Sequence, residues 1–339
     1  MEPMTRGASA EAPGADVWPI TLEDVEEARS RIDPYLTATP LRHYAELDEA
    51  VGGSARVLVK HENHHPTNAF KVRNGLSALT ALDSAERARG VCAATRGNHG
   101  LGLAYAGRIL DVPVVVVVPR GNNPEKNAGM RALGAELLEE GDDYDEAAAA
   151  ADQVARERRL TLVHSTNDRN VLAGAATLWL EVVEQASELD AVVVGVGGGS
   201  QAVGALVVLR ALRPSVPVYA VQAAGAAAAH DSWHAGRMVS VERADTFADG
   251  LATRSAYAMT FPALRAGLAG FVTVTDGEIA ASIRTLLRTT HNLAEGAGAV
   301  GVAGVARLRE ELAGRTVAVV LSGANIDAET LRRVLNDEV

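Results

Sequence analysis

The stretch AVVVGVGGGSQAVG, residues 191–204, contains the features that decide the fold. An uninterrupted apolar run ends in Gly197, Gly198, Gly199 and Ser200, and a helical pattern follows. A continuous apolar run is typical of a strand that is buried on both faces of a sheet. Successive glycines before a helix let backbone N–H groups surround an anion, and the helix N-terminus favours negative charge. The stretch therefore predicts a buried strand, a phosphate-binding turn and a helix.

Two other interpretations of these glycines are a dinucleotide-binding turn and a plain tight turn. Gly195 and Gly197 match the first two glycines of the dinucleotide fingerprint, but Ser200 occupies the third position. The next strand ends in Gln222, where an acidic residue would contact a ribose. The dinucleotide interpretation therefore fits poorly, whereas a tight turn that binds no ligand stays open.

Similar apolar runs alternate with helical stretches along most of the chain. The other runs are ARVLVK (55–60), GVCAAT (90–95), VPVVVVVP (112–119), LTLVHS (160–165), VPVYAVQ (216–222), FVTVT (271–275) and RTVAVVLS (315–322). This alternation predicts parallel βαβ units, and hence an α/β fold with open parallel sheets. The first helix is expected from Thr21, because Thr21 and Asp24 resemble a capping box. In such folds, ligands bind beyond the carboxyl ends of the strands.

Composition excludes several classes of protein. The chain has 339 residues, is 47% hydrophobic, and suits one large or two medium domains. Its net charge of −11, without a long basic run, argues against nucleic-acid binding. Cys92 is the only cysteine, which excludes an internal disulfide and indicates a reducing compartment. Residues 1–19 lack the apolar core of a signal peptide, and no apolar run is long enough to span a membrane. We expect a disordered lead-in over 1–19, no membrane partner and a cytoplasmic location.

Polar residues follow two more of the predicted strands. TRGNHG (95–100) lies at a strand–helix junction, where backbone N–H groups and a hydroxyl suit a carboxylate. Asn98 in this motif has the alternative of being a simple helix cap. LSGANID (321–327) offers the neutral hydroxyl of Ser322 to a ligand, although this motif taken alone is a weak signal that helix capping explains better.

The segment PTNAFKVRNG (66–75) places Lys71 directly after Phe70 among turn-forming residues. A solvated charge is the usual role of a lysine, but a surface lysine does not need such surroundings, so a nucleophilic lysine is the alternative interpretation. The preceding HENHHP (61–66) contains three histidines and suggests a zinc site. No cysteine or suitably spaced His/Glu set completes that site, so we expect no metal there.

Together these motifs resemble the fold-type II pyridoxal-phosphate enzymes, specifically the serine/threonine dehydratase (ammonia-lyase) family. The family pattern is Pro-Thr-Gly-Ser-Phe-Lys, then Ser-x-Gly-Asn-His, a tetraglycine loop, and Ser/Cys-Gly-Gly-Asn. This chain has PTNAFK, TRGNHG, GGGS and SGAN in the same order and at similar separations. ADGLA (248–252) and AEGAGA (294–299) also look like family segments, and the resemblance covers residues 20–335.

The resemblance implies a role for each motif residue. Lys71 would form a Schiff base with pyridoxal 5'-phosphate, and Phe70 would lie against one side of its ring. Asn98 would bond the ring's 3-hydroxyl oxygen, and Ser322 would face the pyridine nitrogen. The phosphate would be held by Gly197, Gly198, Gly199 and Ser200. The substrate carboxylate would be received by the loop that contains Thr95, Gly97 and His99.

The resemblance also implies the architecture and the reaction. The cofactor would lie in the cleft between a large domain (20–89 and 166–339) and a small domain (90–165), and the protein would be a homodimer. The expected reaction is β-elimination from a β-hydroxy amino acid such as threonine or serine, giving a 2-keto acid and ammonia. A β-replacement synthase and a racemase of the same fold are the alternatives. A nucleotide-binding protein without catalytic activity would leave Lys71 and Phe70 unexplained.

The chain departs from the family pattern at three places. Asn68 and Ala69 replace the usual Gly-Ser before Phe70, which leaves room for an unusual substrate. Arg96 replaces a small or hydroxyl residue. Its side chain either points out of the crevice or points inward, where its planar fork suits a carboxylate of the substrate. The third departure lies where serine racemase-like members bind Mg²⁺ or Ca²⁺; this chain has Gln222, Ala226 and Ala228 there. Such cations prefer several oxygens, carboxylates included, so we expect that site to be lost.

Overall fold

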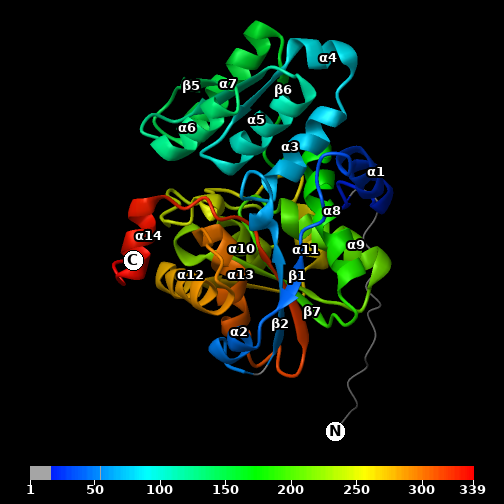
Figure 1. Cartoon of the computed structure of the whole chain (residues 1–339), viewed down its shortest axis with the longest axis vertical. Coiled ribbons are helices and arrows are strands. Elements are labelled where there is room, and N and C mark those ends of the chain that lie inside the picture. Colours follow the sequence, from blue (N-terminus) through cyan, green and yellow to red (C-terminus); the bar gives the residue numbers. More distant parts are fainter. Residues whose placement is uncertain (1–16, 54) are drawn as a thin grey trace.

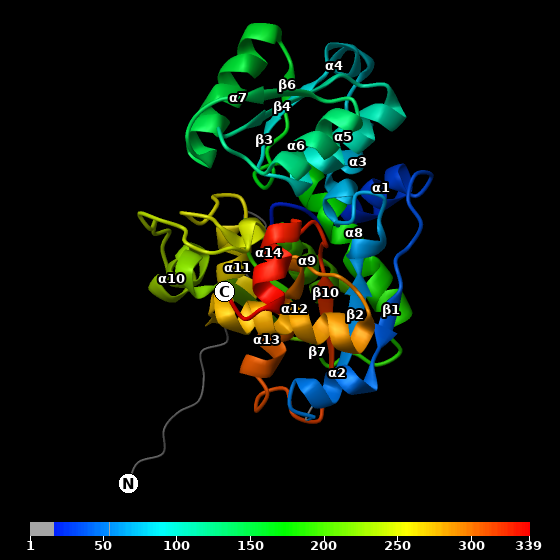
Figure 2. The same ribbon diagram turned by 60° about the vertical axis from the view of Figure 1, so that its left-hand side comes forward.

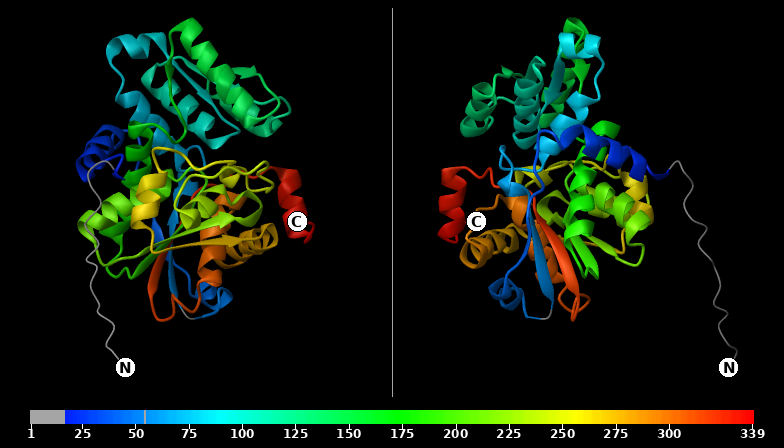
Figure 3. Two further views of the ribbon diagram at one scale, coloured as in Figure 1. Left: turned by 180° about the vertical axis from the view of Figure 1, so that it is seen from behind. Right: turned by 45° about the vertical axis from the view of Figure 1, so that its right-hand side comes forward.

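The computed structural model describes residues 17–53 and 55–339, so most of the predicted lead-in (1–19) lies outside the described residues. Two sheets, each with its own helices, form two parts of the molecule (Figure 1). Figures 2 and 3 show the same division from other directions. No helix in the described ranges is long and apolar enough to cross a membrane.

The larger sheet has six strands in the order β1-β2-β10-β7-β8-β9. They are β1 (Leu41–His43), β2 (Arg56–His61), β7 (Ala191–Gly195), β8 (Val218–Ala223), β9 (Gly270–Val274) and β10 (Thr316–Leu321). The smaller sheet has four strands in the order β5-β4-β3-β6. They are β3 (Val91–Ala94), β4 (Val114–Val118), β5 (Glu136–Glu139) and β6 (Thr161–Leu162).

Helices cover both sheets and join them. The α-helices of the larger part are α1 (Leu22–Ile32), α2 (Ala45–Ala50), α8 (Arg169–Gln185), α9 (Ser200–Leu212), α10 (Ala228–Ala235), α11 (Phe261–Gly267), α12 (Asp276–Thr290), α13 (Gly296–Arg307) and α14 (Ala328–Leu335). The larger part also contains the 3₁₀ turns η2 (Glu62–His64), η3 (Ala224–Ala226) and η4 (Asp249–Leu251). Those beside the smaller sheet are α4 (Ser84–Arg89), α5 (Asn98–Leu110), α6 (Pro124–Ala132) and α7 (Tyr144–Arg158). Helix α3 (Lys71–Thr80) lies between the two parts (Figure 1).

The valine-rich strands are buried on both faces, as their continuous apolar character predicts. In β7, Val192 and Val194 pack into the core beneath α8 and α9, while Ala191 and Val193 pack into the core beneath α12 and α13. Side chains of a strand alternate between faces, so only a continuous apolar run fills two cores at once. The capping box predicted for Thr21 and Asp24 is also present at the start of α1.

The sheets differ from the sequence prediction in three respects. Strands β1 and β5 were not anticipated, because each is short, has no fully buried residue and lacks a long apolar run. Strand β1 pairs antiparallel with β2, whereas all other pairs in both sheets are parallel. Of the predicted run LTLVHS, only residues 161–162 pair as a strand.

Four helices pack against one another in a series through glycines, so that their backbones nearly touch. A Cβ added at Gly102 of α5 would lie 2.3 Å from the Lys71 carbonyl oxygen at the start of α3. A Cβ at Gly174 of α8 would lie 2.6 Å from the Arg73 carbonyl oxygen, and one at Gly204 of α9 would lie 2.7 Å from the backbone of α8. Such distances are below any normal contact, so only glycine permits this spacing. We name this series α5–α3–α8–α9 the glycine stack.

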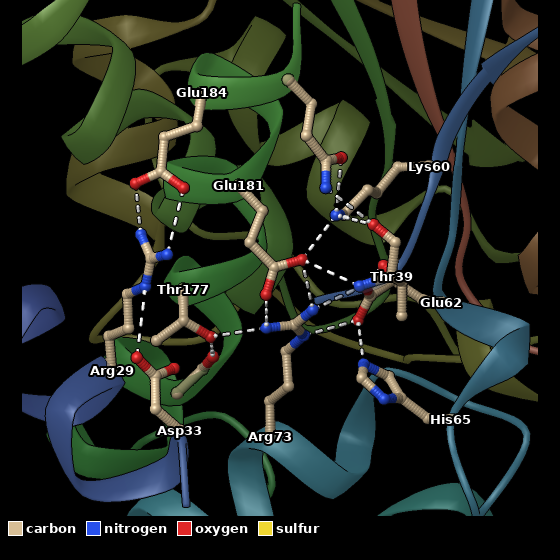
Figure 4. A network of polar contacts seen from close by, with 12 residues as sticks. Arg29, Asp33, Thr39, Lys60, Glu62, His65, Arg73, Thr177, Glu181 and Glu184 are labelled. Carbon is tan, nitrogen blue, oxygen red and sulfur yellow. Dashed lines mark hydrogen bonds and ion pairs between the residues drawn. The ribbon is translucent and has the colours of Figure 1, made fainter. Parts of the chain in front are cut away.

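A buried network of charges also fixes α3 (Figure 4). The Arg73 guanidinium donates to Glu62 over 2.7 and 2.9 Å, and to Glu181 of α8 over the same two distances. Lys60 donates to Glu181 as well, and all four side chains are buried. Burial opposes ionisation of Glu62, but Arg73 and His65 outweigh it and hold the pKa of Glu62 well below its usual value. Two cations therefore neutralise two anions in the interior.

Removing one member of this network should strongly destabilise the fold. We expect Arg73→Met to lower the free energy of unfolding by about 3–5 kcal/mol, because two buried carboxylates lose their main partner. Arg29→Met is the matched control, since Arg29 pairs with Glu184 of the same helix α8 at a more exposed position and should cost about 0–1 kcal/mol. Urea denaturation followed by circular dichroism measures both. Equal losses for the two variants would contradict the interpretation.

Candidate active site

A cavity of about 510 Å³ lies between the two parts of the molecule, and every residue that the sequence analysis selected for cofactor or substrate lines it. These residues are Phe70, Lys71, Thr95, Arg96, Gly97, Asn98, His99, Gly197, Gly198, Gly199, Ser200 and Ser322. They come from the ends of β2, β3, β7 and β10 and from the helices that follow. Because β2, β10 and β7 are parallel neighbours, their carboxyl ends share one edge of the larger sheet.

Lys71 is the first residue of α3 and brings an amine to the cavity, and no carboxylate of residues 17–53 or 55–339 forms an ion pair with it. Its Nζ donates to the carbonyl oxygen of Ser165 over 3.2 Å and lies 5.0 Å from the centre of the Phe70 ring. Burial lowers the pKa of Lys71 to about 8. A sizeable fraction of this amine is therefore neutral near physiological pH, which a nucleophile or a general base requires.

The segment before Lys71 is shaped by an unusual backbone conformation. Asn68 has a φ of 53°, in the left-handed region that glycine occupies readily and that asparagine tolerates better than most residues. Its carbonyl accepts a hydrogen bond from the Ala324 N–H, and the Phe70 N–H donates to the Ser322 carbonyl, both over 2.9 Å. These bonds bring the lysine segment and Ser322 together.

Ala69, in the same segment, is fully buried and does not line the cavity. The expectation that the Asn68–Ala69 replacement reflects an unusual substrate is therefore not supported by its position. Asn68 has a backbone role, and Ala69 packs close to Gly323, with which it forms a β-bridge.

The glycine turn between β7 and α9 forms a cradle that a side chain would fill. A Cβ at Gly197 would lie 2.1 Å from the Gly250 carbonyl oxygen, and one at Gly198 would lie 2.1 Å from the Thr166 hydroxyl. Gly199 has a φ of 94°, which disfavours other residues. The first N–H groups of α9 have no partner within the helix and carry its positive dipole end. The turn is thus suited to an anion.

A second helix start faces the cavity at residues 95–99. The Thr95 hydroxyl accepts hydrogen bonds from the N–H groups of Gly97, over 3.0 Å, and Gly100, over 3.4 Å, which shapes the turn into α5. His99 is buried, and its Nε2 lies 3.1 Å from the Val163 carbonyl oxygen. Burial lowers the pKa of His99 to about 3, so its ring is neutral at physiological pH.

Glu295 and Asn325 were missed as site residues, although both lie in family-like segments. The Asn98 amide donates to Glu295 over 2.6 Å and accepts from the Asn325 amide over 2.7 Å. Burial raises the pKa of Glu295, although Lys126 opposes this effect. Asn98 is thereby held between two side chains from the far end of the sequence, with one amide hydrogen left for a ligand.

Two further residues bring contrasting groups to the cavity. Ser322 contributes a neutral hydroxyl, which donates to the Ala297 carbonyl oxygen over 3.1 Å. Arg96 contributes a cation whose Nε is buried and has no hydrogen-bond partner among the described residues. Arg96 also lines a neighbouring cavity of about 460 Å³.

The three histidines that suggested zinc bond to separate protein groups. His61 contacts the Tyr44 hydroxyl over 2.9 Å, His64 contacts Asn292 over 2.8 Å, and His65 contacts Glu62 over 3.1 Å. Within residues 17–53 and 55–339, no three His, Cys, Asp or Glu side chains are grouped as a metal site requires.

Comparisons with known proteins agree with this geometry. A family model described as pyridoxal-phosphate dependent enzyme matches residues 32–323. The chain is 37% identical to the L-threonine ammonia-lyase of Thermotoga maritima, over 94% of this chain and 78% of that protein. It is 32% identical to the L-threo-3-hydroxyaspartate ammonia-lyase of a Pseudomonas species, over 93% of this chain and 98% of that protein. The solved structure of maize serine racemase matches with a TM-score of 0.88 at 25% identity, covering 94% of this chain and 98% of that one.

The lowered pKa of Lys71 can be measured in protein that carries no ligand. Competitive acetylation across pH 6–11, read by mass spectrometry, should show half-maximal reactivity of Lys71 near pH 8. Lys126 is the internal control in the same cavity: burial lowers its pKa, but Asp249 and Glu295 outweigh burial and raise it above the usual value of about 10.4. If both lysines become reactive at the same pH, the description of Lys71 as an unpaired buried amine is wrong.

Proposed function

Because this chain belongs to the family of pyridoxal-phosphate dependent enzymes, we propose that it is a lyase acting on a β-hydroxy amino acid such as L-threonine or L-serine. The products would be a 2-keto acid and ammonia, and the water lost in dehydration balances the water taken up in deamination. The observation that carries the proposal is the Lys71 amine, which has a carbonyl oxygen but no carboxylate as a partner among the described residues and shares one cavity with the starts of two helices. The similar ammonia-lyases are named for threonine and for hydroxyaspartate, so family membership leaves the substrate side chain open.

The residues of the cavity fit the cofactor. The cradle of Gly197, Gly198, Gly199 and Ser200 has no room for a Cβ at its first two positions and suits the phosphate. We assign Lys71 as the covalent attachment point, Phe70 as the wall on one side of the ring, and Asn98 as the donor to the 3-hydroxyl oxygen. Ser322 would face the pyridine nitrogen. Each of these groups lines the cavity.

The bound cofactor supplies an electron sink for the substrate α-carbon. Lys71 Nζ would then take the α-proton, a role that suits an amine with a pKa of about 8. Ser322 is a neutral partner and, unlike a carboxylate, does not hold a proton on the ring nitrogen. This limits stabilisation of negative charge at the α-carbon and favours expulsion of the β-substituent.

The start of α5 would bind the substrate α-carboxylate. The N–H groups in the first turn of α5 have no helical partner, and the Thr95 hydroxyl and Gly97 shape the turn before it. His99 is neutral at physiological pH, so it would orient the loop and would not act as a cation. The carboxylate is thereby fixed on the side of the cavity formed by the smaller part.

A racemase is the second candidate, because maize serine racemase has a closely similar structure. Racemisation needs a proton donor or acceptor on the face of the substrate opposite Lys71. By resemblance, racemases carry a serine at the position of Arg96, and an arginine is not an effective base because it stays protonated. We therefore propose that elimination dominates. Rapid interconversion of D- and L-serine by the wild type would reverse this order.

Three further elements of the proposal rest on the sequence. We propose a homodimer by resemblance to the family, and a cytoplasmic location because the single cysteine indicates a reducing compartment. We also propose that the small domain spans 90–165, with the large domain in 20–89 and 166–339. The strands of the smaller sheet all lie within 91–162, which supports that division, but α4 (Ser84–Arg89) also lies beside the smaller sheet (Figure 1) and precedes the proposed boundary at residue 90.

The attachment of the cofactor can be tested directly. Borohydride reduction followed by peptide mass spectrometry should locate it on Lys71. Lys71→Ala should lose at least roughly 10³-fold in keto acid release, since it removes both the attachment point and the proposed base. Lys126→Ala is the control for loss of a lysine from the same cavity. A reduced adduct on any other lysine would reject the assignment.

The activity should be insensitive to chelators. Gln222 is buried at the end of β8, and its side-chain oxygen already accepts a hydrogen bond from the His230 N–H over 3.0 Å. Ala226 and Ala228 nearby offer no side-chain oxygen for a hard cation. We expect EDTA to change the rate of keto acid release less than about 2-fold. A large loss that Mg²⁺ or Ca²⁺ restores would show that the backbone still forms a cation site.

A further inference from the structure

Arg96 is a cation in the cavity wall that the proposed chemistry does not use. It lies between Thr95 and Gly97, in the turn from β3 into α5, and its side chain is half-buried. The buried Nε has no partner, and no hydrogen bond or ion pair of the guanidinium is found among the described residues. Burying part of a permanent charge without a partner is costly, so such a group is suited to an anionic ligand.

Three other cations that line the two cavities differ from Arg96, because carboxylates of the protein already bind them, whereas Arg243, which also lines the first cavity, is exposed to solvent. Lys126 donates to Asp249 over 2.6 Å, Arg254 pairs with Asp143 and Asp145, and Arg120 pairs with Glu140 and Asp142. Near Arg96, the carboxylates of Asp249 and Glu295 are also engaged, the first by Lys126 and the second by Asn98. Arg96 therefore remains available to a ligand.

The cofactor phosphate and the substrate α-carboxylate have other binding places in the proposed function. The phosphate is assigned to the start of α9, and the α-carboxylate to the start of α5. Both helices have 13 residues, so each presents a full helix terminus. An anion at Arg96 is consequently a third one.

We propose that Arg96 binds a second carboxylate, carried on the side chain of the substrate, so that the preferred substrate is a β-hydroxy amino dicarboxylic acid. This inference rests on the proposed lyase function and specifies its substrate class. The planar guanidinium presents parallel N–H groups that match a carboxylate in two-point contact. Arg96 also lines the second cavity, so its side chain borders space outside the cavity that contains Lys71.

The test compares substrates that differ only in this charge. The holoenzyme is assayed for keto acid release from L-threo-3-hydroxyaspartate and from its neutral amide, threo-3-hydroxyasparagine. We expect kcat/KM for the acid to exceed that for the amide by roughly 10- to 100-fold, the range for a charge-assisted hydrogen bond. In Arg96→Gln this preference should fall to within about 3-fold, mainly through KM for the acid.

Arg120→Gln is the matched control, because it removes the same charge from the wall of the second cavity alone. It should keep the preference for the acid. The inference is overturned if the wild type does not prefer the acid, or if Arg96→Gln retains the preference.

Binding of succinate, measured by isothermal titration calorimetry on the holoenzyme, separates this inference from the proposed function. Succinate should bind wild type and Arg120→Gln alike, and Arg96→Gln roughly 10-fold more weakly or worse. If no β-hydroxy amino acid releases keto acid, the proposed function fails, while succinate binding still tests Arg96. Equal succinate binding by wild type and Arg96→Gln overturns the inference, whatever the activity.

Discussion

The ion pairs of Arg73 with Glu62 and Glu181 are the interaction on which the geometry of the cavity depends. Arg73 follows Lys71 by two residues in the same helix, so the contacts that fix the guanidinium also fix the backbone that carries the Lys71 amine. One carboxylate belongs to the turn that precedes α3, and the other belongs to α8. In the interior the guanidinium cannot exchange these partners for water, so the start of α3 has one stable position.

The contrast between paired and unpaired cations separates structure from chemistry in this protein. Arg73 and Lys60 are neutralised by buried carboxylates and serve the fold. Lys71 has only a carbonyl oxygen, and Arg96 has no partner among the described residues. Both side chains line the cavity. A charged group without an oppositely charged partner is energetically unfavourable there, and a bound ligand would reduce that cost. In this protein, a cation that lacks a carboxylate partner is therefore a better indicator of function than a cation that has one.

Much of the fold and the position of the site followed from local signals in the sequence. The valine runs, the glycine turn at 197–199 and the cap at Thr21 act within a few residues, so a single sequence displays them. The exposed strands β1 and β5 carry no such signal and form because neighbouring strands offer them hydrogen bonds. Within the candidate site, the contact of Asn98 with Glu295 joins residues 197 positions apart, and no local pattern encodes it. The arrangement of Arg73 with its carboxylates was missed for the same reason.

The close packing of the glycine stack limits which parts of the cavity substitutions can change. The starts of α5, α3 and α9 carry the proposed carboxylate site, Lys71 and the proposed phosphate site, and backbone-to-backbone packing sets their spacing. No flexible side chain lies at those crossings to stretch or compress the spacing. Arg96 belongs to a loop that precedes α5 and takes no part in these crossings, so a substitution at position 96 leaves the helix spacing unchanged. If Arg96 binds substrate as proposed, the spacing of the site and the choice of substrate depend on different residues, and a mutation can change one without the other.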